Sequence, residues 1–213
     1  MNLKQLESIL DDFDDFDEPN ILFEQYVTPG YVAARMLHTI SLDDHIKGKT
    51  IVDLGTGPGI LAIGSALLGA DYVVGVDLDE NVFQIAKSNL EELDELFPGK
   101  PPIDFVHDDV TKCSLEKKSF DVAIFNPPFG TKGNSGIDIE FLKVALNLTR
   151  ESVYSLHKSA TRSLLATCER MNVNQIGFTL GGIFTMDSHT FLLYLLENAG
   201  LMLMFITNFN KSQ

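Results

Sequence analysis

The most informative stretch of the 213-residue chain is Thr50-Ile51-Val52-Asp53-Leu54-Gly55-Thr56-Gly57-Pro58-Gly59. Its first half is a short apolar run with β-branched residues, which predicts a buried strand. Its second half is a glycine-rich turn, and the apolar residues 60–68 that follow predict a helix. Glycines let a backbone approach a ligand without Cβ atoms in the way, so this unit is typical of nucleotide-binding α/β folds.

Alternating strands and helices are expected outward from this unit. Further strands are predicted at residues 72–76, 103–107, 120–125 and 152–156. Further helices are predicted at residues 31–40, 80–96, 139–148 and 159–171. Repeated alternation of this kind predicts an α/β fold with a mostly parallel, doubly wound sheet that carries helices on both faces. In such a sheet, ligands bind at the carboxyl ends of the strands.

The N-terminal region departs from this pattern. Helical spacing is present in the apolar residues Leu3, Leu6, Ile9 and Leu10. An acidic run over residues 11–18 follows, which is typical of a solvated linker. Thr28 is expected to cap the next helix, with Pro29 at its first position.

The C-terminal residues 172–213 form a second unusual region. They carry only three charged side chains, those of Asp187, Glu197 and Lys211. Residues 191–206 are strongly apolar but fall short of the roughly 20 residues that span a membrane. We expect an apolar tail or a helix packed on the sheet, and no membrane association. The predicted organisation is a helix and linker over 1–20, an α/β domain over 21–171 and a divergent segment over 172–213.

Charge and cysteine content limit the classes of function. The chain has 30 acidic and 16 basic residues, a formal net charge of −14. Because nucleic-acid binding through phosphates favours a basic surface, an RNA substrate would require a local basic patch or a basic partner. Cys113 and Cys168 are too far apart in sequence to indicate a zinc cluster, so no metal is expected. The acidic N-terminus is unlike a signal or transit peptide, which predicts a cytosolic or nuclear location.

Acidic residues at successive strand ends predict a nucleoside site. Asp77 ends the second predicted strand, where a carboxylate can accept hydrogen bonds from both ribose hydroxyls. NAD enzymes also have an acid there, so Asp77 alone does not name the cofactor. Asp53 before the glycine turn, and Asp109 and Val110 after the third strand, favour S-adenosylmethionine, with the last two expected near the adenine.

Asn126-Pro127-Pro128-Phe129 follows the fourth predicted strand directly and predicts methyl transfer to a planar nitrogen. An amino group conjugated to a ring is a poor nucleophile because its lone pair is delocalised. The Asn126 side-chain oxygen and the Pro127 carbonyl can each accept one of its hydrogens, which frees the lone pair. Pro128 stiffens the loop, and Phe129 offers a ring for a base to stack on. These four are the predicted catalytic residues.

Longer strings around these motifs resemble the methyltransferase-like enzymes that form N6-methyladenosine in small-subunit ribosomal RNA. The strings are Glu24-Gln25-Tyr26-Val27-Thr28, Ala33-Ala34-Arg35-Met36-Leu37, Asp53-Leu54-Gly55, Asn126-Pro127-Pro128-Phe129-Gly130-Thr131-Lys132, Phe141-Leu142-Lys143 and Val153-Tyr154-Ser155-Leu156-His157-Lys158-Ser159. The resemblance covers residues 1–168 and implies a seven-stranded Rossmann-like S-adenosylmethionine methyltransferase fold. It implies cofactor contacts from Gln25, Thr28, Gly55, Pro58, Leu61, Asp77, Asp109 and Val110, with residues 126–129 holding the adenine.

The resemblance also implies a partner and a location. The family is associated with a small zinc-ribbon activator subunit, which we expect to form a heterodimer by adding a strand to the edge at residues 103–107. The location implied is the nucleus, including the nucleolus, and the cytoplasm. Two features depart from the family. Pro58 stands where a cysteine is frequent, and the final antiparallel strand pair is not visible after Glu169, so the sheet is expected to end incomplete.

Three interpretations stay open. The first is RNA adenine-N6 methylation. His157 and Lys158, together with Lys132, Arg150 and Arg162, would then form a small basic patch on the catalytic rim, although His157 suits a packing role equally well. The second is methylation of a protein glutamine, which uses the same two acceptors. The third is a non-catalytic scaffold that retains the motifs.

Overall fold

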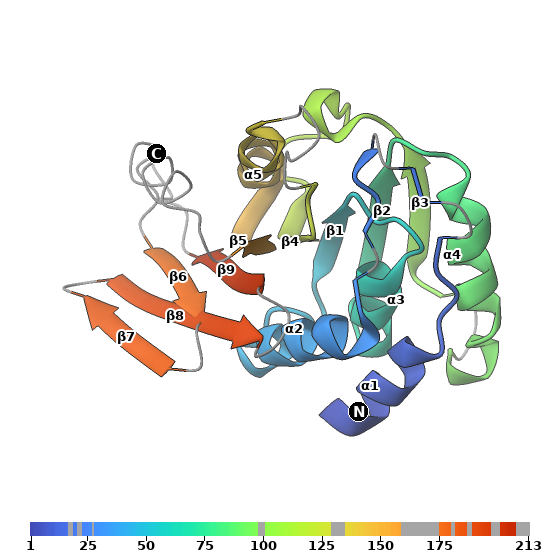
Figure 1. Ribbon diagram of the computed structural model, residues 1–213, viewed down its shortest axis with the longest axis horizontal. Helices are drawn as coiled ribbons and strands as arrows, with labels where there is room; N and C mark the ends of the chain where they lie inside the picture. Colours follow the sequence, from blue (N-terminus) through green and yellow to red (C-terminus); the bar gives the residue numbers. More distant parts are fainter. Residues whose placement is uncertain are drawn as a thin grey trace.

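The structure is a computed structural model that describes residues 1–16, 19–20, 23–26, 28–97, 101–128, 135–158, 175–179, 182–186, 189–196 and 201–207. Five parallel strands form its centre in the order β3-β2-β1-β4-β5 (Figure 1). These are β1 (Thr50–Leu54), β2 (Tyr72–Asp77), β3 (Ile103–His107), β4 (Phe120–Phe125) and β5 (Thr149–Lys158). The predicted doubly wound, mostly parallel sheet is confirmed.

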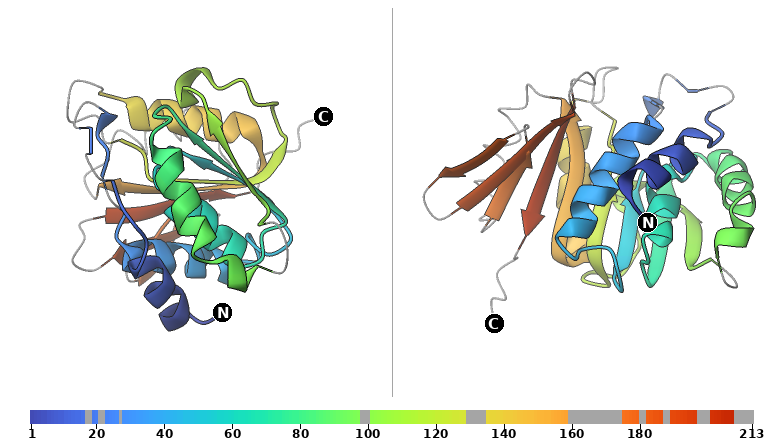
Figure 2. Two further views of the ribbon diagram at one scale, coloured as in Figure 1. Left: turned by 90° about the vertical axis from the view of Figure 1, so that its right-hand side faces the viewer. Right: turned by 90° about the horizontal axis from the view of Figure 1, so that it is seen from below.

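Helices cover both faces of this sheet. They are α1 (Leu3–Asp11), α2 (Gly30–Leu42), α3 (Ile60–Leu67), α4 (Val82–Glu91) and α5 (Ile137–Leu148), with short 3₁₀ turns η2 (Asp94–Leu96) and η3 (Val110–Lys112). Figure 2 shows α5 on one side of the sheet and α1, α2 and α3 on the other. The predicted helix over 80–96 is shorter, because α4 ends at Glu91, and the predicted helix over 159–171 lies outside the described residues.

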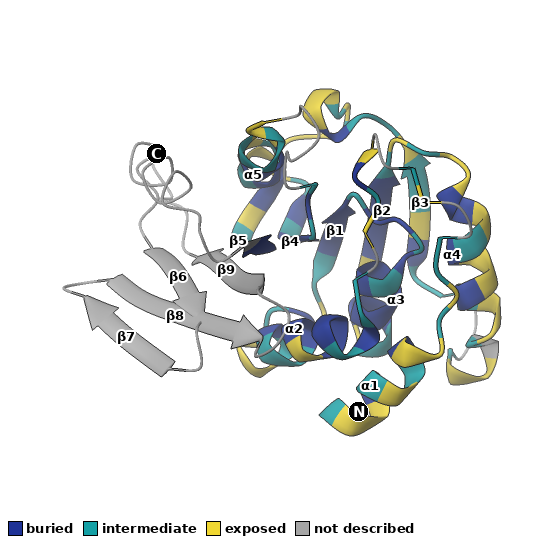
Figure 3. Cartoon of the chain, viewed as in Figure 1, coloured by how far each residue is buried: buried dark blue, intermediate teal, exposed yellow. Residues whose placement is uncertain are grey.

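Alternation along the strands builds the two cores. In β1, Ile51 packs in the cluster with α1, α2 and α3, whereas Val52 and Leu54 pack in the cluster with α5. Because successive side chains of a strand point to opposite faces, a one-residue slip would exchange the two sets. Figure 3 shows buried residues on the central strands β1, β2 and β4 and on the helices α2 and α3. Truncating a fully buried side chain such as Leu37 to alanine would cost about 2–5 kcal/mol.

The N-terminal helix is continuous with this core. Asn2 and Gln5 cap α1 reciprocally, with 3.0 Å hydrogen bonds from each backbone N–H to the other's side chain. Leu6 and Leu10 are buried in the same cluster as α2 and α3. Asp11, Asp12 and Asp14, which end and follow α1, are exposed, but the backbone of this segment is held against the core. Asp14 hydrogen-bonds through its backbone to the fully buried Asn89 of α4, which draws this segment over the glycine turn.

The C-terminal segment corrects a prediction. It contains four strands, β6 (Gln175–Thr179), β7 (Gly182–Met186), β8 (His189–Leu196) and β9 (Leu201–Thr207). β9 pairs antiparallel with β5, β6 and β8, so the described strands form a nine-stranded sheet in the order β3-β2-β1-β4-β5-β9-β8-β7, with β6 paired to β9 off this path.

The expected apolar tail or packed helix is therefore wrong, as is the expected incomplete sheet. The apolar run consists of two strands, β8 and β9, which pair antiparallel with each other. Among the described residues, no helix has the length and apolarity needed to cross a membrane.

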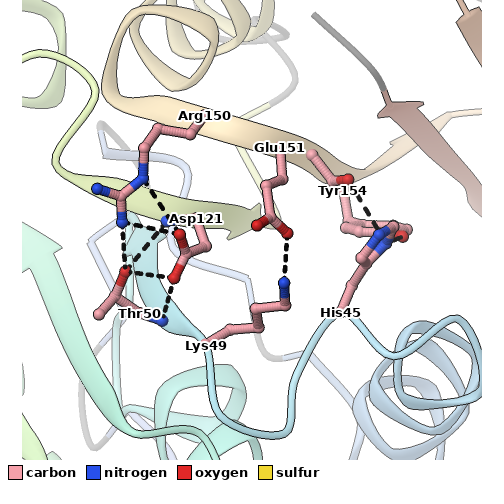
Figure 4. A network of polar contacts seen from close by, with 8 residues as sticks. His45, Lys49, Thr50, Asp121, Arg150, Glu151 and Tyr154 are labelled. Atoms are coloured by element: carbon pink, nitrogen blue, oxygen red, sulfur yellow. Dashed lines mark hydrogen bonds and ion pairs between the residues drawn. The ribbon is translucent and has the colours of Figure 1, made fainter.

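A polar network joins the strands at their amino ends, opposite to the carboxyl ends where ligands are expected (Figure 4). The Thr50 N–H and hydroxyl donate to Asp121 Oδ2 at 2.9 and 2.8 Å, and Arg150 Nη2 donates to Asp121 Oδ1 at 2.7 Å. Lys49 Nζ lies 2.6 Å from Glu151 Oε2. Arg150 was expected on the catalytic rim, and this is wrong. It lies seven residues from His157, or roughly 23 Å along the strand.

Candidate active site

Two neighbouring cavities lie at the carboxyl ends of the central strands. The first has a volume of about 170 Å³ and the second about 260 Å³. The first is lined by Phe16, Phe23, Glu24, Gln25, Tyr26, Gly55, Gly57, Asp77, Leu78, Asp109, Val110, Thr111, Asn126, Pro127, Pro128, Ile137 and Phe141. The two share a wall made of Phe16, Tyr26, Gly55, Gly57 and Asn126. The strand order reverses between β1 and β4, which is where sheets of this kind bind ligands.

Asp77 ends β2 and lines the first cavity. Its Oδ2 accepts from the Gly57 N–H at 2.8 Å, and its Oδ1 accepts from the Asp79 N–H at 3.0 Å. Burial raises the pKa of this carboxyl, against the opposing effect of those backbone hydrogen bonds. Each oxygen keeps a second lone pair, so the carboxylate can still accept from a ribose diol.

The glycine turn is held by the sheet. The Gly55 N–H donates to the Val76 carbonyl at 2.8 Å, and Gly57 has a φ of +51°, which favours glycine. A Cβ added at Gly57 would lie 3.0 Å from Phe16 Cζ. Asp53 lines neither of the two cavities. It is buried beneath the turn, where its Oδ2 accepts from the Thr56 hydroxyl at 2.7 Å and burial raises its pKa to about 7.

The other residues implied as cofactor contacts are distributed unequally. Gln25, Asp109 and Val110 line the first cavity, and Pro58 lines the second. Gln25 also donates from Nε2 to Asp79 Oδ2 at 2.9 Å, which ties the N-terminal segment to the loop after β2. The Asp109 side chain caps its own turn by accepting from the Thr111 N–H and hydroxyl, and these bonds hold its pKa low. Leu61 is buried in the core and lines neither cavity.

Asn126 follows β4 and contributes to both cavities. Its Nδ2 donates to the Thr28 hydroxyl at 2.9 Å. Its Oδ1 is buried and has no hydrogen-bond partner among the described residues. Leaving a buried acceptor unpaired costs free energy, so this oxygen is prepared to receive a donor from a ligand.

Thr28 was expected to cap α2, and this is wrong. The N-cap residue of α2 is Pro29, without a side-chain hydrogen bond, because the Thr28 hydroxyl accepts from Asn126 instead. Thr28 lines the second cavity beside the glycine turn. Pro127 and Pro128 line the first cavity next to Asn126. Phe129 and the predicted string through Lys132 lie outside the described residues.

His157 was offered as an RNA contact or as a packing residue, and the packing role is the one observed. Its side chain is 1% exposed, and its Nε2 lies 2.7 Å from the Ser155 hydroxyl. Burial lowers its pKa to about 3, so the ring is neutral near pH 7. The 3.9 Å approach of Nδ1 to Asp138 is therefore not an ion pair at that pH.

Several lining residues were not predicted from the sequence. The N-terminal segment contributes Phe16, Phe23 and Tyr26, and α5 contributes Ile137 and Phe141. For these residues the sequence contained one signal, the aromatic residue Phe16 within an acidic run, which is unusual for a solvated linker. Across the described ranges, no group of three or more His, Cys, Asp or Glu side chains is arranged to hold a metal ion.

The strand order, the ribose-accepting carboxylate, the glycine turn and the buried acceptor at Asn126 define an S-adenosylmethionine-dependent methyltransferase. Residues 35–126 match the family model described as ribosomal protein L11 methyltransferase (PrmA). The chain is 48% identical over 166 residues to rRNA N6-adenosine-methyltransferase METTL5 of Danio rerio, covering 76% of this chain and 77% of the relative. It is 45% identical over 168 residues to the Drosophila melanogaster enzyme of that name, covering 78% and 76%. The chain belongs to the family of rRNA N6-adenosine-methyltransferases.

A solved structure agrees with this assignment over the whole chain. It is that of a presumed RNA methyltransferase from Pyrococcus horikoshii, which is 26% identical and superimposes with a TM-score of 0.76 over 100% of both chains. The alignment also spans the C-terminal residues, which lie beyond the region that resembles the family in sequence. The predicted family, fold and cofactor are confirmed.

Proposed function

We propose that this chain transfers a methyl group from S-adenosylmethionine to N6 of an adenosine in small-subunit ribosomal RNA. The observation that carries the proposal is the buried, unpaired Oδ1 of Asn126, a residue that belongs to the wall shared by the two cavities. Family membership supports an adenosine of ribosomal RNA as the methyl acceptor, because the relatives are named rRNA N6-adenosine-methyltransferases.

The chain's own residues would act mainly by alignment. Asn126 Oδ1 accepts one hydrogen of the adenine amino group, and the Pro127 carbonyl is suited to accept the other. The hydrogen bond from Asn126 to Thr28 restrains the first acceptor and the proline ring restricts the loop that carries the second, which limits the reorganisation needed in the transition state. When bound, S-adenosylmethionine supplies an electrophilic methyl group. No general base is required, because the methylated nitrogen loses a proton readily to water.

The residues that line the two cavities offer partners for the polar groups of S-adenosylmethionine. Asp77 offers a carboxylate to a ribose diol, and the backbone at Asp109 and Val110 borders the same cavity. The acidic side chains of Asp14 and Asp15 line the second cavity, where they suit the ammonium of an amino-acid moiety.

Because the chain has a formal net charge of −14, we propose that a partner subunit contributes to RNA binding. β3 is the terminal strand of the sheet, and it pairs with β2 alone among the described strands. An unpaired edge is a site where another chain can add a strand. The family resemblance implies a small zinc-ribbon activator here, forming a heterodimer. We further propose that the chain acts in the nucleolus and the cytoplasm, which imaging of a tagged chain would test.

The direct test is methyl transfer from labelled cofactor, with the chain and the activator subunit purified together. Small-subunit ribosomal RNA and a peptide release factor would be offered in parallel. The proposal expects label in the RNA and none in the release factor. Label only in the release factor would establish glutamine methylation instead, and label in neither, from a chain that binds cofactor, would favour the scaffold role.

A further inference from the structure

The wall between the two cavities contains an aromatic ring that the resemblance does not assign to the site. Phe16 follows the acidic residues after α1 and lines both cavities. Its ring lies against the glycine turn, since a Cβ at Gly57 would be 3.0 Å from Phe16 Cζ. Asn126, whose side-chain oxygen has no hydrogen-bond partner among the described residues, belongs to the same wall.

The position of Phe16 is fixed by a buried clamp. Asn89 of α4 is 0% exposed, and its side-chain amide makes three hydrogen bonds. Its Oδ1 accepts from the Asp14 N–H at 2.8 Å, and its Nδ2 donates to the Asp14 carbonyl at 3.0 Å and to the Pro58 carbonyl at 3.1 Å. One side chain thus joins the N-terminal segment, the glycine turn and α4. Removing the Asn89 side chain would release the segment, because the N–H and carbonyl groups of Asp14 would lose their hydrogen-bond partner.

The chemistry of the cofactor explains what an aromatic ring would do there. The first cavity holds the ribose-binding carboxylate of Asp77, and the second borders the far side of the turn at Pro58. The reacting methyl group must lie near Asn126, so the sulfonium between the nucleoside and the amino acid belongs at the shared wall. An aromatic face attracts a cation; the neutral thioether of the product can still pack on the ring but lacks the attraction that depends on charge.

We propose that Phe16 is a cofactor-binding residue that favours the sulfonium of S-adenosylmethionine over the thioether of S-adenosylhomocysteine, with Asn89 as the positioning residue that holds it. The inference rests on the proposed methyl-transfer function. Its consequence is a preference for substrate cofactor over product, which limits inhibition by the product.

The test is calorimetric affinity for both molecules, measured on the full chain with its activator subunit. Phe16→Leu keeps apolar bulk and removes the ring. We expect the affinity for S-adenosylmethionine to fall by about 3- to 10-fold, as for a partly desolvated cation–π contact, while that for S-adenosylhomocysteine falls less than about twofold. Phe97→Leu is the matched control, because Phe97 packs on the core and lines neither cavity, and it leaves the affinity ratio unchanged.

Asn89 is tested through the same ratio. Asn89→Ala is expected to shift the ratio in the same direction, and the double variant with Phe16→Leu is expected to shift it no further, because both changes act on one ring. An Asn89→Ala ratio equal to wild type would overturn the positioning role. Should that variant not fold, the Phe16→Leu measurement decides the proposal alone.

The outcomes separate this inference from the proposed function. Equal losses of affinity for the two molecules in Phe16→Leu would mean that the ring only packs, which overturns the sulfonium preference. A wild-type chain that methylates RNA while Phe16→Leu keeps the wild-type ratio would overturn this inference alone. A wild-type chain that binds neither molecule would overturn both.

Discussion

Replacing Asn126 with alanine is the perturbation that most sharply tests the proposed chemistry. The Oδ1 atom is buried and unpaired within the described structure, so its full accepting capacity is reserved for the amine. Removing a preorganised group of this kind from a transition state costs about 2.7–4 kcal/mol, or a factor of about 10²–10³ in kcat. Cofactor affinity should change little, because Asp77 and the glycine turn keep their own hydrogen bonds.

The assay is single-turnover methyl transfer to ribosomal RNA at saturating cofactor, which isolates the chemical step. Asn147→Ala is the matched control, since Asn147 is exposed on α5 and the same atoms are removed. Asn126→Asp keeps an oxygen acceptor and should retain more activity than Asn126→Ala. A loss of less than tenfold in Asn126→Ala, with the fold intact, would refute the role given to this oxygen.

Three further changes follow from the geometry. Thr28→Val removes the acceptor for Asn126 Nδ2, so kcat should fall about tenfold, while Thr28→Ser should stay near wild type; equal rates for both variants would contradict this. Gly57→Ala places a Cβ against Phe16 at a φ of +51°, which strains the glycine turn. The dissociation constant of the cofactor, measured by calorimetry, should therefore rise at least about tenfold. An unchanged constant would show that the turn does not contribute to cofactor binding. His157 has a folded pKa of about 3 against about 6.5 unfolded, so the unfolded state binds the proton and stability is lost as pH falls below about 6.5. In urea unfolding, the stability of wild type relative to His157→Gln should therefore drop by about 2 kcal/mol between pH 7 and pH 5, and a constant difference would show that the ring is not buried neutral.

The centre of the fold could be predicted because its signals are local. The strand before Gly55, the carboxylate that ends β2 and the Asn-Pro-Pro turn after β4 each combine an apolar run with a residue type that marks its end. Strand ends meet at one edge of a parallel sheet, so Asp77 and Asn126 were expected to lie near one cavity, and both line it.

The C-terminal strands could not be predicted because periodicity fails there. A continuously apolar run such as residues 201–206 fits a strand or a buried helix equally well, because it lacks the alternation that distinguishes the two. The identity of β9 depends on β5 and β6, which pair with it from elsewhere in the chain.

The errors inside the site have a different physical origin, which is long-range hydrogen bonding. Thr28 carries a strong local capping signal, but its hydroxyl accepts from Asn126, 98 residues away. Asp14 lies in a run typical of linkers, but Asn89, 75 residues away, holds it and brings Phe16 into the wall. Arg150 and His157 are residue types that suit RNA binding, but Arg150 lies at the amino end of β5, where it binds Asp121, and His157 is buried.

The measurement that tests the account most directly is mass spectrometry of nucleosides from small-subunit ribosomal RNA. Cells lacking this chain would be compared with cells that express the wild type or Asn126→Ala. We expect N6-methyladenosine at the affected site to be lost without the chain, to return with the wild type and not to return with Asn126→Ala. Unchanged N6-methyladenosine in cells without the chain, or full recovery with Asn126→Ala, would contradict this expectation.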